Sequence, residues 1–179
     1  MPRKPKVRWP DLHTPPETWS AAEARGVCIN PIVTGIGRHP RSVSDEDWVL
    51  SCEQDVEENG QAQLLTDLLH ILRLTIPRYL GKPPEVGQCP RQISEGEVPL
   101  PNVSHPGDRD WTDDWKGEMV GGILCNPVYA GIPPFEPMVD DQTWIAAGVK
   151  MAAQVGLRQY FTNVLYELKK SLSKLSFDP

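Results

Sequence analysis

Residues 28–36 read CINPIVTGI, and residues 124–132 read LCNPVYAGI. Each stretch has Asn-Pro, three further residues and then Gly-Ile, and the second lies 96 positions after the first, from Asn30 to Asn126. Asn-Pro is a turn signal, because proline restricts the residue before it to an extended backbone. A repeated turn of this kind indicates that one structural unit occurs twice in the chain.

The match continues on both sides of the turn without a gap. At the same offset Trp19 pairs with Trp115, and Trp48 pairs with Trp144. Further identical pairs are Gly26/Gly122, Gly35/Gly131, Val43/Val139, Asp45/Asp141, Gly60/Gly156, Gln63/Gln159, Thr66/Thr162, Leu69/Leu165 and Leu72/Leu168. We therefore predict a tandem duplication within one compact domain. Its parts are a basic arm at 1–16, a first unit at 17–76, a proline-rich linker at 77–112 and a second unit at 113–179.

Each unit has the pattern of a turn, then a short extended stretch, and then two helices. Ser44 and Asp140 are good N-caps, and they predict first helices at 45–58 and 141–155. Gly60 and Gly156 then interrupt the helical pattern. The second helices carry broad apolar faces: Leu64, Leu65, Leu68, Leu69 and Leu72 in one unit, and Leu157, Tyr160, Phe161, Val164, Leu165 and Leu168 in the other.

These faces are too apolar to be left in water, and a unit of about 60 residues buries them poorly alone. We expect a mainly α fold with short β or extended segments, in which the two units pack with pseudo-twofold symmetry and the leucine-rich helices lie at the seam. In the alternative, one face is covered by another protein. The linker at 77–112 contains seven prolines, which predicts an irregular connection and not a helix.

Composition indicates the class of protein. A hydrophobic fraction of 39% and a charged fraction of 23% fit a soluble globular chain. No apolar run is long enough to cross a membrane. The N-terminus has no apolar segment after its basic start, so it does not read as a secretory signal. Cys28, Cys52, Cys89 and Cys125 form no C-x-x-C pair, which argues against a zinc ribbon or a disulfide scaffold. A cytoplasmic protein with reduced, mostly buried thiols is predicted.

A search for catalytic residues gives no convincing set. His13, His39 and His105 lie in proline-rich stretches, and His70 sits among the leucines of a predicted helix, where a place at the edge of the core is expected. No Ser-His-Asp, H-E-x-x-H or P-loop spacing occurs. The sequence therefore predicts a non-enzyme with no cofactor and no metal, although a small enzyme with a site between the two units is an alternative.

Charge is distributed unevenly along the chain. The first eight residues carry four basic side chains and no acidic one, so the remainder of a chain of net charge −6 has a formal charge of −10. The helix at 45–58 is rich in carboxylates and lacks Lys and Arg, which fits a solvated face or a docking surface for a basic partner. Candidate partner-binding residues are Arg3, Lys4, Lys6 and Arg8 in the arm, Asp47, Glu53, Asp55, Glu57 and Glu58 in the helix, and Phe135 in a proline-rich loop.

Residues 123–144 contain Ile123, Leu124, Asn126, Pro127, Tyr129, Gly131, Val139, Asp141 and Trp144. This pattern resembles a segment of the recombinase domain of the large serine recombinases. The resemblance implies a DNA-binding context for these residues, but the chain lacks the serine-bearing catalytic domain and the zinc-ribbon cysteines of that family.

Taken together, these features favour a non-catalytic adaptor or accessory subunit that makes protein–protein contacts in a bacterial-type multi-component assembly. The first alternative is a nucleic-acid-binding accessory factor, for example of a mobile element or defence system, that would use the basic arm. The second is the small enzyme with a site between the units. No membrane partner is expected.

Overall fold

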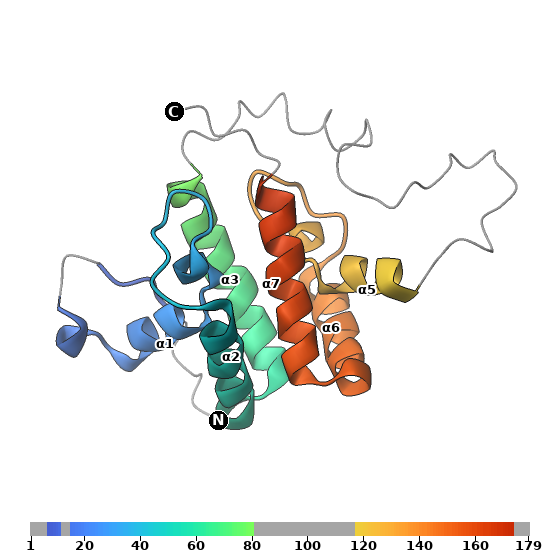
Figure 1. Ribbon diagram of the computed structural model, residues 1–179, viewed down its shortest axis with the longest axis horizontal. Coiled ribbons are helices and arrows are strands. Elements are labelled where there is room, and N and C mark those ends of the chain that lie inside the picture. The colour runs from blue at the N-terminus through green and yellow to red at the C-terminus, as the bar shows by residue number, and fades with distance from the viewer. Residues whose placement is uncertain (1–6, 12–14, 81–116, 174–179) are drawn as a thin grey trace, which may run out of the picture.

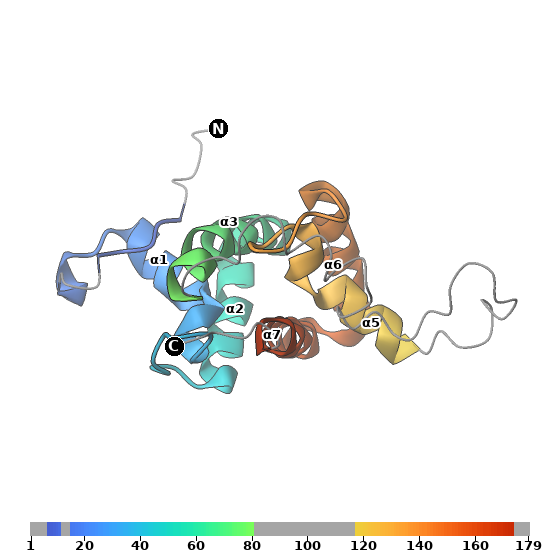
Figure 2. The ribbon, with the colours of Figure 1, turned by 90° about the horizontal axis from the view of Figure 1, so that it is seen from above.

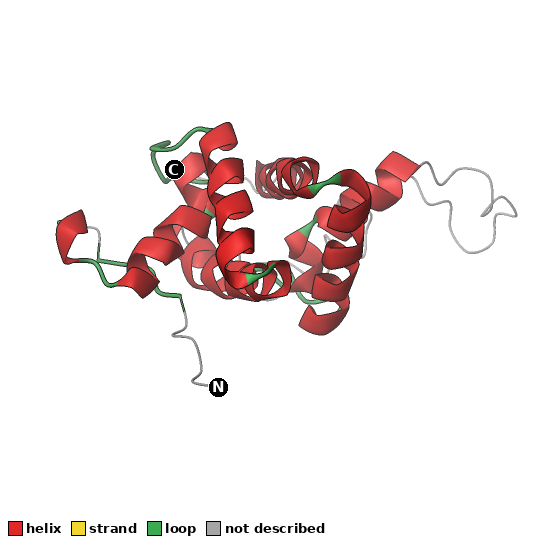
Figure 3. Ribbon diagram, turned by 90° about the horizontal axis from the view of Figure 1, so that it is seen from below, coloured by secondary structure: helices red, strands yellow, loops and turns green. Residues whose placement is uncertain are grey.

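The computed structural model describes residues 7–11, 15–80 and 117–173, and regular structure in this part of the chain is helical throughout (Figure 1, Figure 3). The α-helices are α1 (Ala21–Ile29), α2 (Asp45–Asn59), α3 (Gln61–Tyr79), α5 (Gly117–Cys125), α6 (Asp141–Val155) and α7 (Leu157–Ser173). Short 3-10 helices are η1 (Pro16–Thr18), η2 (Pro31–Thr34) and η3 (Pro127–Ala130). The mainly helical fold is confirmed. The predicted short β segments are wrong, since the described residues contain no strand.

The repeated Asn-Pro stretches explain that error. The side chain of Asn30 accepts a hydrogen bond at 3.1 Å from the amide two residues ahead, and Asn126 does the same at 3.1 Å. This bond bends the backbone into a 3-10 turn, and the following proline has a φ suited to the first helical position. Gly35 and Gly131 then end the turns with φ of 89° and 85°, a left-handed conformation that favours glycine. The chain forms a 3-10 turn at each place where an extended stretch was expected.

Capping defines where α2 and α6 begin. The Asp47 amide donates to the Ser44 hydroxyl at 3.0 Å, and the Thr143 amide donates to the Asp140 carboxylate at 2.8 Å. Each bond satisfies one of the helix N-terminal amides that would otherwise lack a partner. The predicted helices at 45–58 and 141–155 are confirmed, with α2 extending one residue further.

Two boundaries differ from those predicted. The residues before each Asn-Pro turn form full helices, α1 and α5, which the sequence pattern did not reveal. α3 also continues through Pro77 to Tyr79, so the first residues of the predicted linker are helical. Proline is tolerated there because it removes only one hydrogen bond close to the end of the helix. The part of the predicted linker from residue 81 to residue 112 lies outside the described residues.

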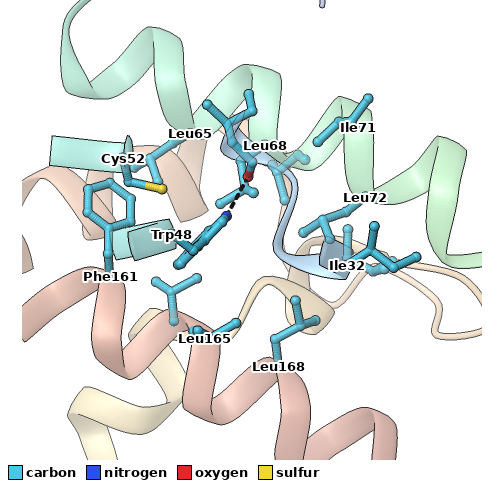
Figure 4. Close-up of a cluster of buried hydrophobic side chains, with 14 of the residues drawn as sticks. Ile32, Trp48, Cys52, Leu65, Leu68, Ile71, Leu72, Phe161, Leu165 and Leu168 are labelled. Carbon is cyan, nitrogen blue, oxygen red and sulfur yellow. Dashed lines mark hydrogen bonds between the residues drawn. The ribbon is translucent and has the colours of Figure 1, made fainter. Parts of the chain in front are cut away.

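The two sides of the molecule share one hydrophobic core. Helices α1, α2 and α3 lie on one side and α5, α6 and α7 on the other (Figure 1). α2 packs against α7, and α3 packs against α6 (Figure 2). In the centre the rings of Trp48 and Phe161 meet edge to face with centroids 6.2 Å apart (Figure 4). The Trp48 indole also donates to the Ile29 carbonyl at 3.0 Å, which satisfies its only polar atom inside the core.

Candidate binding groove between α2 and α7

A cavity of about 750 Å³ lies between α2 and α7. The floor is apolar, because Val49 of α2 and Leu165 of α7 are core residues whose side chains also line the cavity. Tyr166 stands at the rim with 63% of its surface exposed. The other lining residues are Asp45, Glu46, Arg158, Thr162, Lys169, Lys170 and Ser173. The cavity therefore lies between the two predicted units, because α2 belongs to one and α7 to the other.

Helical spacing brings these side chains to one surface. Arg158, Thr162, Leu165 and Lys169 follow one another at intervals of three or four residues, which places them along one face of α7. Asp45 pairs with Lys169 and Glu53 pairs with Arg158, so α2 and α7 run antiparallel. The cavity is thus an elongated groove between two antiparallel helices.

The walls of the groove have opposite charge. The α2 wall presents Asp45 and Glu46, whereas the α7 wall presents Arg158, Lys169 and Lys170. Lys169 Nζ lies 2.7 Å from an Asp45 carboxylate oxygen, and the Arg158 pair with Glu53 is longer at 3.1 Å. Ion pairs as exposed as these are worth about 0–1 kcal/mol. A ligand can therefore exchange them for its own contacts at low cost.

Two interactions connect the sides of the molecule at the ends of α7 and α3. Besides Asp45, Lys169 binds the Thr34 carbonyl at 3.3 Å. On the opposite side, Arg73 donates to the Asp141 carboxylate at 2.7 and 2.8 Å and to the carbonyls of Ala130 and Gly131. The hydrogen bond from Arg73 lowers the pKa of Asp141, and the same contact raises the pKa of Arg73. The Lys169 contacts link the start of α2 to α7, and the Arg73 contacts link α3 to the start of α6.

The predicted acidic face of α2 has three environments. Asp47, Glu57 and Glu58 are exposed, as a docking surface would require. Glu53 lies beside the groove through its pair with Arg158. Asp55 instead points inward and is only 7% exposed, so its carboxylate is held within the fold and is not available to a partner.

Asp55 belongs to a nearly buried ionic cluster formed by α1, α2 and α3. The Arg25 guanidinium donates to Asp55 at 2.5 and 2.8 Å and to Asp67 at 2.6 Å. These contacts, the bond to Asp55 foremost, raise the pKa of Arg25. All three residues come from the predicted first unit. The cluster is therefore not a site between the units, and both carboxylates bind the Arg25 cation.

The remaining candidates outside α2 are scattered. Arg8 is exposed, and Phe135 is half-buried against the core. Arg3, Lys4 and Lys6 lie outside the described residues. The candidates among the described residues thus do not lie together at one place.

The described cysteines do not have the properties of nucleophiles. Cys52 and Cys125 are buried, and burial raises the pKa of both thiols, that of Cys125 to about 12. Cys28 is exposed, whereas the other two described thiols are buried as expected, and partial desolvation still raises the pKa of Cys28. Cys89 and His105 lie outside the described residues. Within the described ranges, no group of three or more His, Cys, Asp or Glu side chains is arranged to hold a metal ion.

The basic wall of the groove was not predicted from the sequence. Its residues do follow a helical spacing, but they flank a strongly apolar face of the same helix, which dominates the pattern.

None of the helices that the structure describes is both long and apolar enough to cross a bilayer. Comparison of the chain with protein-family models, curated proteins and solved structures finds no match, so the resemblance of residues 123–144 to serine recombinases stays a prediction.

Proposed function

We propose that the protein is a non-catalytic adaptor subunit that holds a helical segment of a partner protein in the groove between α2 and α7. The observation that carries this proposal is the apolar floor of Val49 and Leu165 between walls of opposite charge. A groove of this kind accepts a third helix whose apolar residues recur every three or four positions.

Charge complementarity sets the expected orientation of the partner. Acidic side chains along one flank of the bound helix would face Arg158 and Lys170, and basic side chains along the other flank would face Glu46. Tyr166 would cover the apolar face of the bound helix from the rim. The centroid of its ring already lies 5.6 Å from the Lys170 ammonium, which keeps the two side chains next to each other.

The proposed scaffold is a tandem duplication packed about a pseudo-twofold axis. The same offset of 96 residues separates the bounds of α1 from those of α5, of η2 from η3, and of α2 from α6. Asn30 donates to Thr75 at 3.1 Å, and Asn126 donates to Ser171 at 2.9 Å at equivalent positions. In a twofold interface residue i contacts residue j and j contacts i. At the offset of 96 residues, Lys169 corresponds to Arg73 and Asp45 corresponds to Asp141. The Lys169–Asp45 and Arg73–Asp141 pairs are therefore equivalent contacts, made once in each direction between the two copies, and they support the proposal.

The differences between the two proposed copies favour the α2–α7 groove as the functional one. Four of its polar and aromatic lining residues have counterparts, 96 positions away, that carry little charge. Glu46, Arg158, Tyr166 and Lys170 correspond to Gln142, Ala62, His70 and Leu74. A purely structural role would not require this change on one side only.

Selection from a library of helical peptides tests the proposal. Thr162 lines the groove and is exposed, so Thr162→Trp fills the groove without altering its charge. Thr66→Trp is the matched control, since Thr66 is also exposed and bonds its own helix in the same way. We expect enriched peptides with an apolar stripe and one acidic flank, whose affinity falls about tenfold or more in the Thr162 variant only. No enrichment, or equal binding to parent and Thr162 variant, would refute the proposal.

A further inference from the structure

A second surface lies at the C-terminal end of α3. Three Arg–aromatic dipeptides from distant parts of the chain meet there: Arg8-Trp9, Arg38-His39 and Arg78-Tyr79. The centroid of the His39 ring lies 4.9 Å from that of Tyr79, and the Trp9 ring lies 6.1 Å from His39 and 6.3 Å from Tyr79. We refer to these six residues as the arginine–aromatic patch.

Backbone contacts hold the three dipeptides together. The Arg8 amide donates to the Ala22 carbonyl at 3.2 Å, and the Arg38 amide donates to the Tyr79 carbonyl at 3.0 Å. Both approaches require glycine. A Cβ on Gly26 would overlap the Arg8 carbonyl oxygen, and one on Gly37 would lie 2.7 Å from the Tyr79 carbonyl oxygen. The patch is therefore built by the fold.

The patch combines two kinds of surface. The rings of Trp9, His39 and Tyr79 are half-buried, so they are supported by the core and still reach the surface. The side chains of Arg8, Arg38 and Arg78, each the chain neighbour of one of these ring residues, are exposed. Three exposed arginines close together in the fold concentrate basic side chains on a chain whose net charge is −6.

We infer that this patch binds single-stranded nucleic acid. Unpaired bases offer flat faces that stack on aromatic side chains, and arginine binds phosphate through a planar set of donors. A double helix would present phosphates to the arginines but no base faces to the rings. Three rings with three neighbouring arginines fit a short run of nucleotides, bound without strong sequence preference.

Local stability accounts for part of the arrangement. A cation near the C-terminal end of a helix is favourable, which explains Arg78. Edge-to-face rings also bury apolar surface. Neither effect explains why exposed arginines from two other segments, Arg8 and Arg38, also adjoin the ring residues in the chain. Binding is thus assigned to Arg8 of the predicted basic arm together with Arg38 of the first unit and Arg78 of α3.

Fluorescence anisotropy with a labelled oligonucleotide of about 15 nucleotides, dT or U, tests the inference on the full chain. Each phosphate contact lowers log K by about 0.7 per tenfold rise in salt. Three arginine contacts predict about twentyfold weaker binding at 200 mM than at 50 mM salt. With Arg38→Gln and Arg78→Gln combined, the same change in salt should weaken binding only about threefold.

Further variants separate binding at the patch from binding elsewhere on the chain. His39→Ala should weaken binding about fivefold or more, because a stacking ring is lost. Lys150→Gln, an exposed cation on α6, should leave binding nearly unchanged. The inference is overturned if the oligonucleotide does not bind or if the double arginine variant binds like the parent. It is also overturned if replacing Arg3, Lys4 and Lys6 abolishes binding while the patch variants do not, or if a poly-glutamate peptide competes as well as the oligonucleotide.

Discussion

Replacing Arg25 by glycine should destabilise the protein strongly. The guanidinium makes three hydrogen bonds of 2.5 to 2.8 Å to Asp55 and Asp67, and the side chains of both aspartates are 8% exposed. Its removal leaves two nearly buried carboxylates side by side without a cation. Breaking a buried ion pair by removing one partner costs about 3–5 kcal/mol. For a chain of this size we expect the melting temperature to fall by roughly 6–20 °C.

A triple variant shows whether the loss comes from the unpaired carboxylates. The residues 96 positions after Arg25, Asp55 and Asp67 are Gly121, Met151 and Asn163. The triple variant Arg25→Gly, Asp55→Met, Asp67→Asn introduces these three residue types and so removes both carboxylates together with the arginine. Because an ionic triad can be replaced by uncharged residues with little loss, the triple variant should recover about 2 kcal/mol or more relative to Arg25→Gly.

Urea unfolding followed by circular dichroism gives both free energies, and the slope of each transition checks that the variants unfold in the same manner. A loss below about 1 kcal/mol for Arg25→Gly would contradict the ionic account of this cluster. So would a triple variant that is no more stable than the single one, since the carboxylates would then not be the source of the loss.

Three further predictions concern the core and the crossed ion pairs. The Tyr160 hydroxyl is buried and has no hydrogen-bond partner among the described residues. Tyr160→Phe should therefore leave the free energy of unfolding in urea unchanged or raise it by up to about 1 kcal/mol. A lower free energy of unfolding would mean that the hydroxyl does have a hydrogen-bond partner. Gly148→Ala should cost about 1–3 kcal/mol in the same assay, because its Cβ would overlap that hydroxyl, and Tyr160→Phe should reduce the cost. Arg73 lowers the pKa of Asp141, so their pair stabilises the fold above the unfolded pKa of about 3.9 and loses this effect as pH falls through the folded pKa. Asp141→Asn should therefore reduce the dependence of the urea midpoint on pH below about 4, and an unchanged dependence would argue against the pair.

Features set by neighbouring residues could be predicted from the sequence. Ser44 and Asp140 predicted the starts of α2 and α6, because a cap acts within one turn of its helix. The leucine spacing of α3 predicted its buried face, since Leu64 and Leu72 are both fully buried. These features depend on chain geometry over a few residues, which a single sequence reveals.

Features that depend on distant residues could not be predicted in this way. Asp55 resembled its exposed acidic neighbours, because nothing near it in the sequence indicates the contact with Arg25. The groove likewise needs α2 and α7, whose facing residues Glu53 and Arg158 are far apart in the chain. The 3-10 turns were missed for a different reason. The hydrogen bond that the Asn30 side chain accepts from the Ile32 amide is local, but the pattern of apolar residues gives no sign of it.

The exchange of helix contacts between the two sides has a consequence for how the protein unfolds. α2 rests on α7 and α3 rests on α6, so each side supplies the surface that covers the other. Melting either side would expose the rings of both Trp48 and Phe161, which leaves no stable intermediate with half of the helices in place. We therefore expect the two sides to unfold as a single cooperative unit.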